Sequence, residues 1–544
     1  RQAFASQFRG LWTNSGLIPQ LTSVAEAFHN IDGWADGWHA IRQTLRYDKD
    51  SISAHSLSEL QRLEGLLTPK NLAGRIRVEV LSQNSFFDDI DDEDTDPNID
   101  KLSKYQLKLK QLGRLAGDDT QLITDFLPAL LKTNSQNIHR FSCGVAQSFH
   151  NIQSLLTDAK SIIVEIERPV LNLAFIFGLI EEWNKIDADA ASTFLNSAVK
   201  DSIWEQFFPQ LQVAVPLNDA GYTRLMYALE LGKAQIRQFN CLQFGGTTAT
   251  LSANQVMTLI LSIADKPDGI PVAIDILHMV IHGAKEKPAA YQCELANYCI
   301  DFCQKLNWQS IIDDSDESFN RHLNAILEFS LQSPIDDENI ELILQRLIDF
   351  KRTSNRMYFF YPNVYLTPFL LHYTKKTLDF IYKPDDDGSY TFALRLLSDN
   401  FASWHEKPLF QAPEHLVLEW CQVSPNDRLK FIAQICSPFK LNQIEVDNGS
   451  ENSLSEHAKN IFRLAENKKE ILDIFIDKFP PSGGIGSLAA IIRSRISALD
   501  ELNTENDITI THMIVAAKER LEEMAVSWAT QEENRDRSRN ESFE

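Results

Sequence analysis

The sequence has few cysteines and no long apolar run. Its 544 residues include 7 cysteines, an odd number without regular spacing, which argues against a disulfide framework and for reduced thiols in the cytoplasm. The longest apolar stretch, Val170 to Ile180, contains Asn172 and ends in Glu181 and Glu182, so it is too short to cross a bilayer. It predicts a buried core helix, and we expect a cytoplasmic protein without a membrane partner.

Signatures of catalysis and nucleotide binding are also missing. The Gly-rich segment 479–486 leads toward an expected helix, but the Lys that a phosphate-binding loop requires does not follow it. No G-x-S-x-G, H-E-x-x-H, C-x-x-C or kinase-like motif set occurs. The acidic runs that begin at Asp92 and Asp314 have Pro97 and Phe319 where a calcium loop needs Gly. The sequence therefore predicts no cofactor, no bound metal and no enzymatic activity.

Basic residues are too few and too dispersed for a nucleic-acid surface. The formal net charge is -23, which repels phosphate backbones. The densest basic group is Lys101, Lys104, Lys108 and Lys110, and it directly follows an acidic run. A solvated helix face is the favoured interpretation of this group, so we expect no nucleic-acid partner.

Apolar residues at helical spacing are present along the whole chain. Ser252 and Gln255 have the spacing of a capping box, an apolar helical face follows them, and segment 266–269 (KPDG) supplies a turn before a second helix over 270–282. Similar units are expected on both sides; Asn218 caps one helix that stops at Gly232. Another apolar stripe contains Ile340, Ile343, Leu344, Leu347 and Ile348.

These helix pairs predict an all-α fold. Because no fixed period relates them, a degenerate HEAT/TPR-like helical-repeat solenoid is favoured over a consensus array. The expected organisation is an N-terminal helical segment over 1–85, an acidic linker over 86–100, a helical-repeat array over 101–525 and a charged tail over 526–544. The tryptophans expected in the core or between helices are Trp34, Trp38, Trp404 and Trp420.

Two groups of side chains have the spacing of metal ligands. His278 and His282 lie one helical turn apart, but the run HMVIH lacks a Glu beside the first His, so packed or partly exposed histidines are favoured over a metal site. Cys299 and Cys303 are also one turn apart and share an expected helix with Cys293. Their apolar neighbours favour small buried thiols over zinc ligands.

An aromatic segment is the candidate protein-binding site. Arg and Tyr are enriched in the residues that dominate protein interfaces, and both occur here next to a Pro that ends regular helix. The alternative interpretation is an aromatic plug between neighbouring repeats. The candidate binding residues are Arg356, Tyr358, Phe359, Tyr361 and Tyr365.

Several segments together resemble a known family. Residues 37–42 (GWHAIR), followed by 66–69 (LLTP) and 76–78 (IRV), look like the helical region after the ATPase core of bacterial STAND-type NTPases of antiviral defence, the Avs group. The charged ending over 528–544 is similar to the way such chains finish. The resemblance extends over most of the chain and depends on helical repeats, not on diagnostic motifs.

What the resemblance implies is a sensor region. In that family the C-terminal repeats recognise a viral protein, such as a phage structural or packaging protein, and an upstream NTPase then oligomerises and activates an effector. No Walker A lysine or magnesium-binding Asp pair occurs here, so only the recognition role transfers. Because the sequence opens with Arg1, it is expected to be part of a larger NTPase.

Two other functions remain open from the sequence. One is a helical scaffold or adaptor that holds host protein assemblies together. The other is an all-α enzyme with an unrecognised metal site, built from His278, His282 and dispersed carboxylates. Host proteins that co-purify with the chain would favour the scaffold, and bound metal would favour the enzyme.

Overall fold

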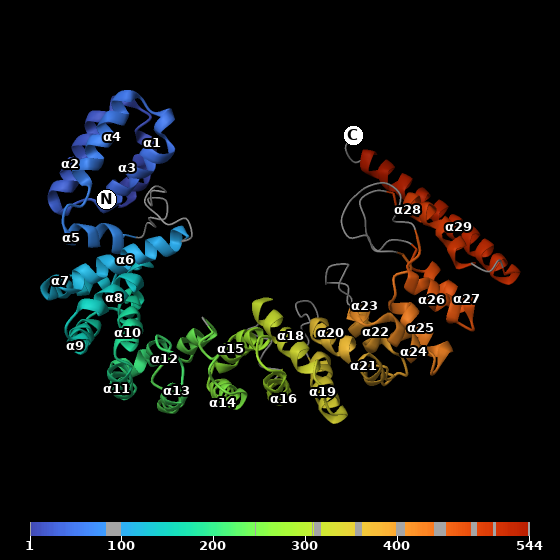
Figure 1. Ribbon diagram of the computed structural model, residues 1–544. Helices are drawn as coiled ribbons and strands as arrows, with labels where there is room; N and C mark the ends of the chain where they lie inside the picture. The colour runs from blue at the N-terminus through green and yellow to red at the C-terminus, as the bar shows by residue number, and fades with distance from the viewer. Residues whose placement is uncertain are drawn as a thin grey trace. The chain divides into compact units, whose positions relative to one another are not determined.

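The computed structural model describes residues 2–82, 100–244, 246–306, 308, 317–353, 362–398, 408–439, 453–479, 487–503 and 507–541. These residues form α-helices joined by short turns and 3-10 segments, as Figure 1 shows, with one π-helical segment at Ile76–Val80. The described ranges contain no β-strand, only an isolated antiparallel bridge between Phe439 and Leu454. The predicted all-α class is confirmed. The chain divides into two compact units, Arg1–Val280 and Ile281–Glu544.

The first unit contains fourteen of the labelled α-helices and most of a fifteenth, which crosses the unit boundary. Their bounds are α1 (Gln2–Leu11), α2 (Ile18–Asp32), α3 (Ala35–Tyr47), α4 (Ala54–Leu67), α5 (Leu72–Arg75), α6 (Lys101–Gly117), α7 (Thr120–Leu130), α8 (Asn137–Ser148), α9 (Ile152–Ile163), α10 (Ala174–Ile186), α11 (Ala188–Ala198), α12 (Phe208–Gln212), α13 (Asp219–Leu231), α14 (Ala253–Ala264) and α15 (Gly269–Ala284).

Helices in the first unit pack mainly on the helix two places further along the chain. α6 contacts α8, α8 contacts α10, and α10 contacts α12, while α7 contacts α9. The N-terminal helices follow the same rule, since α1 contacts α3 and α2 contacts α4. Alternate helices therefore form successive layers, and each helix buries its apolar face between its neighbours.

The N-terminal helices enclose an aromatic core. Phe8 is fully buried, and its ring lies 5.5 Å from the ring of Trp12 and 5.2 Å from that of Trp34, both in edge-to-face geometry. Phe4 and Phe28 complete the cluster around Trp34. Edge-to-face pairs add about 0.5–1.5 kcal/mol each beyond the burial of apolar area. The predicted core position of Trp34 is confirmed, as are those of Trp38 and Trp420. Trp404 lies outside the described residues.

Local helix signals in the first unit form as expected. The side chain of Ser252 accepts from the backbone N–H of Gln255, whose own side chain accepts from the backbone N–H of Ser252, so the capping box before α14 is complete. α13 is capped by Asn218 and ends at Gly232, which has a φ of 62° in the left-handed region. These predictions are confirmed because each depends only on neighbouring residues.

The second unit contains labelled α-helices from four residues long in α23 to 34 residues long in α29. Their bounds are α16 (Ala289–Lys305), α18 (Glu317–Leu331), α19 (Asp337–Thr353), α20 (Pro362–His372), α21 (Thr374–Ile381), α22 (Thr391–Ser398), α23 (Pro408–Gln411), α24 (Glu414–Cys421), α25 (Pro425–Ile435), α26 (Glu456–Leu464), α27 (Lys468–Ile476), α28 (Leu488–Arg495) and α29 (Ile508–Glu541).

Alternate packing recurs in the second unit. α16 contacts α18, α18 contacts α20, α19 contacts α21, and α25 contacts α27. Ion pairs also join alternate helices. Lys376 of α21 contacts Asp337 of α19 at 2.8 Å. Arg520 of α29 contacts Asp473 of α27 and Asp477, which directly follows α27, each at 3.1 Å. The apolar stripe predicted between 340 and 348 is buried in α19.

The predicted tail and the predicted apolar helix are both described. Residues 526–541 continue α29, and the carboxylate of Glu532 accepts hydrogen bonds from Ser487 and from the first amides of α28. The core helix predicted over 170–180 is present in part: α10 begins at Ala174 and buries Phe175 and Ile176, whereas Val170 lies in a preceding 3-10 turn and is 51% exposed. Within the described ranges, every helix is too short or too polar to cross a lipid bilayer. The predicted acidic linker falls almost entirely outside the described residues.

Candidate functional site

The candidate site lies where α6, α8 and α10 pack against one another. Glycines allow the three backbones to touch: a Cβ atom on Gly144 of α8 would lie 1.9 Å from the carbonyl oxygen of Lys110 in α6. A Cβ on Gly178 of α10 would lie 2.3 Å from the carbonyl oxygen of His139 and 2.0 Å from Oγ of Ser142, both in α8. Such close approach brings the polar side chains beside these glycines into mutual contact.

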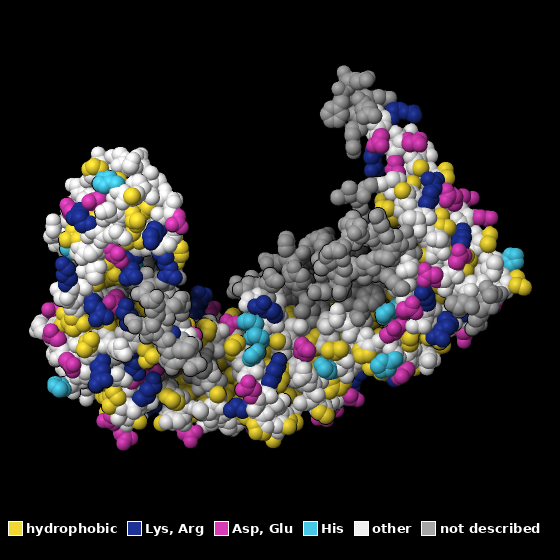
Figure 2. Space-filling model, turned by 45° about the horizontal axis from the view of Figure 1, so that its top comes forward, with side chains coloured by type: hydrophobic (Ala, Val, Ile, Leu, Met, Phe, Trp, Pro, Cys, Tyr) yellow, Lys and Arg dark blue, Asp and Glu magenta, His cyan; other side chains and the backbone are white. Residues whose placement is uncertain are grey.

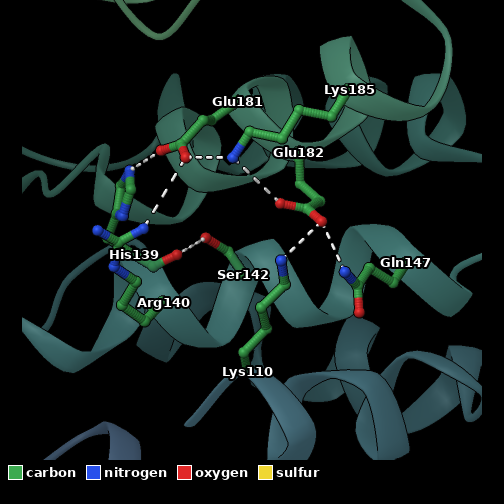
Figure 3. A network of polar contacts seen from close by, with 8 residues as sticks. All are labelled: Lys110, His139, Arg140, Ser142, Gln147, Glu181, Glu182 and Lys185. Carbon is green, nitrogen blue, oxygen red and sulfur yellow. Dashed lines mark hydrogen bonds and ion pairs between the residues drawn. The ribbon is translucent and has the colours of Figure 1, made fainter. Parts of the chain in front are cut away.

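Glu182 is the buried anchor of the site, with only 5% of its surface exposed. Its Oε1 accepts a hydrogen bond from Nζ of Lys110 at 2.7 Å and another from Nε2 of Gln147 at 2.6 Å. Lys110 comes from α6, Gln147 from α8 and Glu182 from α10, so one carboxylate joins all three helices (Figure 3). Its other oxygen, Oε2, lies 3.4 Å from Nζ of Lys185, so three donors compensate the buried charge, and loss of Glu182 itself would remove a contact from all of them.

Glu181, the residue before Glu182, lies on the side of the site that is partly exposed to solvent. Its Oε1 accepts from Nζ of Lys185 at 2.6 Å and lies 3.8 Å from Nη1 of Arg140. Its Oε2 lies 3.2 Å from Nε2 of His139. Figure 3 shows the His139 ring and the Lys185 chain converging on this carboxylate from two helices. The His139 and Glu181 side chains are 31% and 27% exposed, so both can be reached from solvent.

Both carboxyl groups are held in their ionised form. The hydrogen bond with His139, followed by that with Lys185, lowers the pKa of Glu181 to about 2. For Glu182, burial acts to raise the pKa, but the hydrogen bonds from Lys110 and Gln147 outweigh it and the pKa is lowered. A catalytic acid at neutral pH needs a raised carboxyl pKa, so neither group is suited to donate a proton.

Cys143 places a thiol close to His139 and Glu181. It is 1% exposed and lies one helical turn after His139 on α8. Burial, reinforced by the negative charges of Glu181 and Glu182, raises the pKa of this thiol to about 11. The side chain is therefore a neutral thiol at neutral pH and not an activated nucleophile. One ligand-type atom from each of His139, Cys143 and Glu181 lies within 4.8 Å of the other two.

The residues predicted to bind a protein fall mostly outside the described ranges. Arg356, Tyr358, Phe359 and Tyr361 lie in the part of the chain that the structure does not describe. Tyr365 is described: it is 1% exposed in α20, and its ring lies 5.7 Å from the ring of Trp308 in edge-to-face geometry. Burial raises the pKa of its phenol. The Tyr365 ring thus packs inside the second unit, as in the alternative interpretation of an aromatic plug.

The other candidate ligands lie on α15 and α16, and one of them differs from its expected burial. His278 is half-buried and His282 is exposed on α15. On α16, Cys299 and Cys303 are buried as predicted. The prediction of a buried thiol is wrong for Cys293, which is exposed because its six-residue separation from Cys299 places it on another face of the helix. Burial raises the thiol pKa of Cys303 to about 12 and that of Cys299 well above its ordinary range.

Sequence reasoning missed the site at α6, α8 and α10. One signal was available, because His139 and Cys143 have the i, i+4 spacing that places two side chains on one helical face. Glu181 is 38 positions beyond Cys143 along the chain, and only the packing of α8 on α10 brings the two together. Comparison with protein-family models and with curated proteins finds no match to this chain.

Proposed function

We propose that this chain is a protein-recognition module that binds a folded protein partner along a helical-repeat surface. The observation that carries this proposal is the alternate packing of helices in each unit, in which α6, α8, α10 and α12 contact one another in turn. Stacked helical hairpins of the HEAT or TPR kind pack in this way, and they expose an extended row of side chains to partners. We therefore propose a degenerate solenoid of this class for the chain.

Charge supports a protein partner over nucleic acid. The net charge of -23 opposes phosphate binding, whereas it attracts basic patches on a protein target. On the face that Figure 2 draws, Lys and Arg side chains are interspersed with Asp and Glu side chains and do not form a continuous basic stripe. The resemblance to the sensor region of antiviral STAND NTPases points to a phage structural or packaging protein as that partner.

Affinity capture with purified partners tests this proposal. The tagged chain is incubated with lysates of phage-infected and uninfected bacteria, and each retained protein is then purified and titrated against the chain by calorimetry. We expect a phage protein from the infected lysate to bind directly and with saturation. Direct binding of host proteins alone would favour the scaffold function, and the absence of any direct binder would refute the proposal.

Variants of the aromatic segment locate the binding surface. Combined replacement of the four residues 356, 358, 359 and 361 with Ala is expected to weaken partner binding at least about thirtyfold, because loss of even one interface anchor of these types costs about 2 kcal/mol or more. Phe244, an aromatic residue 65% exposed in the first unit, is the matched control, and F244A is expected to bind like the wild type. Equal binding by the combined variant would place the surface elsewhere.

A further inference from the structure

The side chains of His139, Cys143 and Glu181, which lie between α8 and α10, are of the types that bind metal ions in proteins. His139 and Cys143 supply an imidazole and a thiol from one face of α8, and Glu181 supplies a carboxylate from α10. Soft sulfur together with imidazole nitrogen selects zinc over magnesium or calcium, which prefer oxygen ligands. The inference that follows is independent of the proposed recognition function.

The separations fit a tetrahedral ion. With bonds of about 2.1 Å from zinc to nitrogen and oxygen, two ligand atoms of a tetrahedral site lie about 3.4 Å apart. Nε2 of His139 and Oε2 of Glu181 are 3.2 Å apart. Sγ of Cys143 lies within 4.8 Å of one ligand atom of His139 and of one of Glu181, compared with about 3.6 Å in a tetrahedral zinc site, so a movement of about 1.2 Å at most brings the thiol to the ion.

The surrounding contacts orient the carboxylate for this role. Lys185 and Arg140 both contact Oε1 of Glu181, whereas Oε2 faces His139. A hydrogen bond to the second carboxylate oxygen is the usual way in which proteins fix a ligating carboxylate. The helix backbone is also fixed at this point, because Gly178 packs directly on the carbonyl oxygen of His139.

We propose that His139, Cys143 and Glu181 bind one zinc ion through Nε2, Sγ and Oε2, with water as the fourth ligand. On binding, the zinc–sulfur bond replaces the S–H bond of Cys143, and that proton is released to solvent. The proton on Nε2 of His139 moves through solvent to Nδ1 of the same ring, so the imidazole stays neutral and the Nε2 lone pair and Oε2 of Glu181 both turn to the ion. The partly exposed His139 and Glu181 side chains give the ion and its water a path from solvent.

Cobalt substitution tests the site in the whole chain. The chain is treated with chelator, kept reduced with a phosphine, and titrated with Co²⁺ while its absorbance is recorded. We expect one Co²⁺ per chain, with a near-ultraviolet thiolate-to-cobalt band, intense visible bands of tetrahedral Co²⁺, and loss of both on addition of Zn²⁺. A wild-type chain that shows no thiolate band would overturn the proposal.

Variants assign the signal to these residues. C143S is expected to abolish the thiolate band, and E181Q to weaken cobalt binding at least about tenfold. C293S, which removes an exposed thiol on α16, is the matched control and keeps the full signal. If C143S fails to fold, X-ray absorption of the zinc-loaded wild type decides: one sulfur with nitrogen and oxygen neighbours supports the site, and a shell without sulfur overturns it.

Discussion

Replacement of Gly144 by Ala probes the contact between α6 and α8. The added methyl group would lie 1.9 Å from the carbonyl oxygen of Lys110 and 2.8 Å from the backbone nitrogen of Arg114. Both atoms belong to the backbone of α6, so neither can turn aside as a side-chain tip would. The two helices must separate by more than 1 Å to restore ordinary contact, and their joint core loosens with them.

The expected magnitude follows from overpacking. Forcing a methyl group into a packed core costs about 1–3 kcal/mol, and the upper end applies here because the displaced atoms are backbone. Gly65 is the matched control, since it lies inside α4 with no atom within 4 Å of its added Cβ. Ala at that position removes the helix penalty of Gly and is expected to stabilise the first unit by about 0.5–1 kcal/mol.

Thermal unfolding and hydrogen exchange measure the difference. With about 2 °C of Tm per kcal/mol for a unit of this size, G144A is expected to lower the Tm by about 4–6 °C and G65A to raise it by about 1–2 °C. Exchange should accelerate in peptides of α6 and α8 in G144A alone. A G144A chain as stable as G65A would refute the inference that these backbones touch.

Three further changes test other contacts. Burial lowers the pKa of His39 to about 4, so the stability that the neutral imidazole provides is full above pH 6.5 and is lost as the pH falls toward 4. About 2–3 kcal/mol of the unfolding free energy should be lost by pH 4.5, and H39F should flatten that part of the curve of unfolding free energy against pH. Lys478 donates to three carbonyl oxygens at the end of α25, each at 2.7 Å, so K478M should lower the unfolding free energy by about 1–3 kcal/mol and speed amide hydrogen exchange at the end of α25. K469M, at an exposed position, is the control, and equal exchange in the two variants would contradict this prediction. E182Q should destabilise the first unit by about 3 kcal/mol in denaturant titrations, because it removes the buried carboxylate that pairs with Lys110. Addition of K110M should recover part of this loss, and unfolding free energies that simply add in the double variant would argue against an interaction between Lys110 and Glu182.

The elements that the sequence predicted well are those encoded by neighbouring residues. The capping box at Ser252 and Gln255 and the left-handed Gly232 each depend on a few consecutive positions, and the structure contains both. The continuous apolar stretch that predicted most of α10 is equally local. An all-α fold was predictable for this reason, because helix formation and helix ends are decided within a few turns.

The candidate site was not predictable because its partners are distant along the chain. Lys110 meets Glu182 across 72 positions, and the contact requires that Gly144 and Gly178 let three backbones approach. Glycine lowers helix propensity, so in a sequence it indicates a less stable helix. That it allows close contact between two helices can be recognised only when the neighbouring helix is known. The His139 and Cys143 pair was visible, but the carboxylate that completes the set was not.

Alternate-helix packing also bears on how each unit folds. Because α6 binds α8 and α8 binds α10, most partners are close in sequence, and loops of modest length close each contact. Such a topology favours rapid nucleation at any one layer followed by growth to both sides. The end layers of each unit, which contact a neighbour on one side only, should therefore exchange their amide hydrogens faster than the layers between them, before the unit unfolds as a whole.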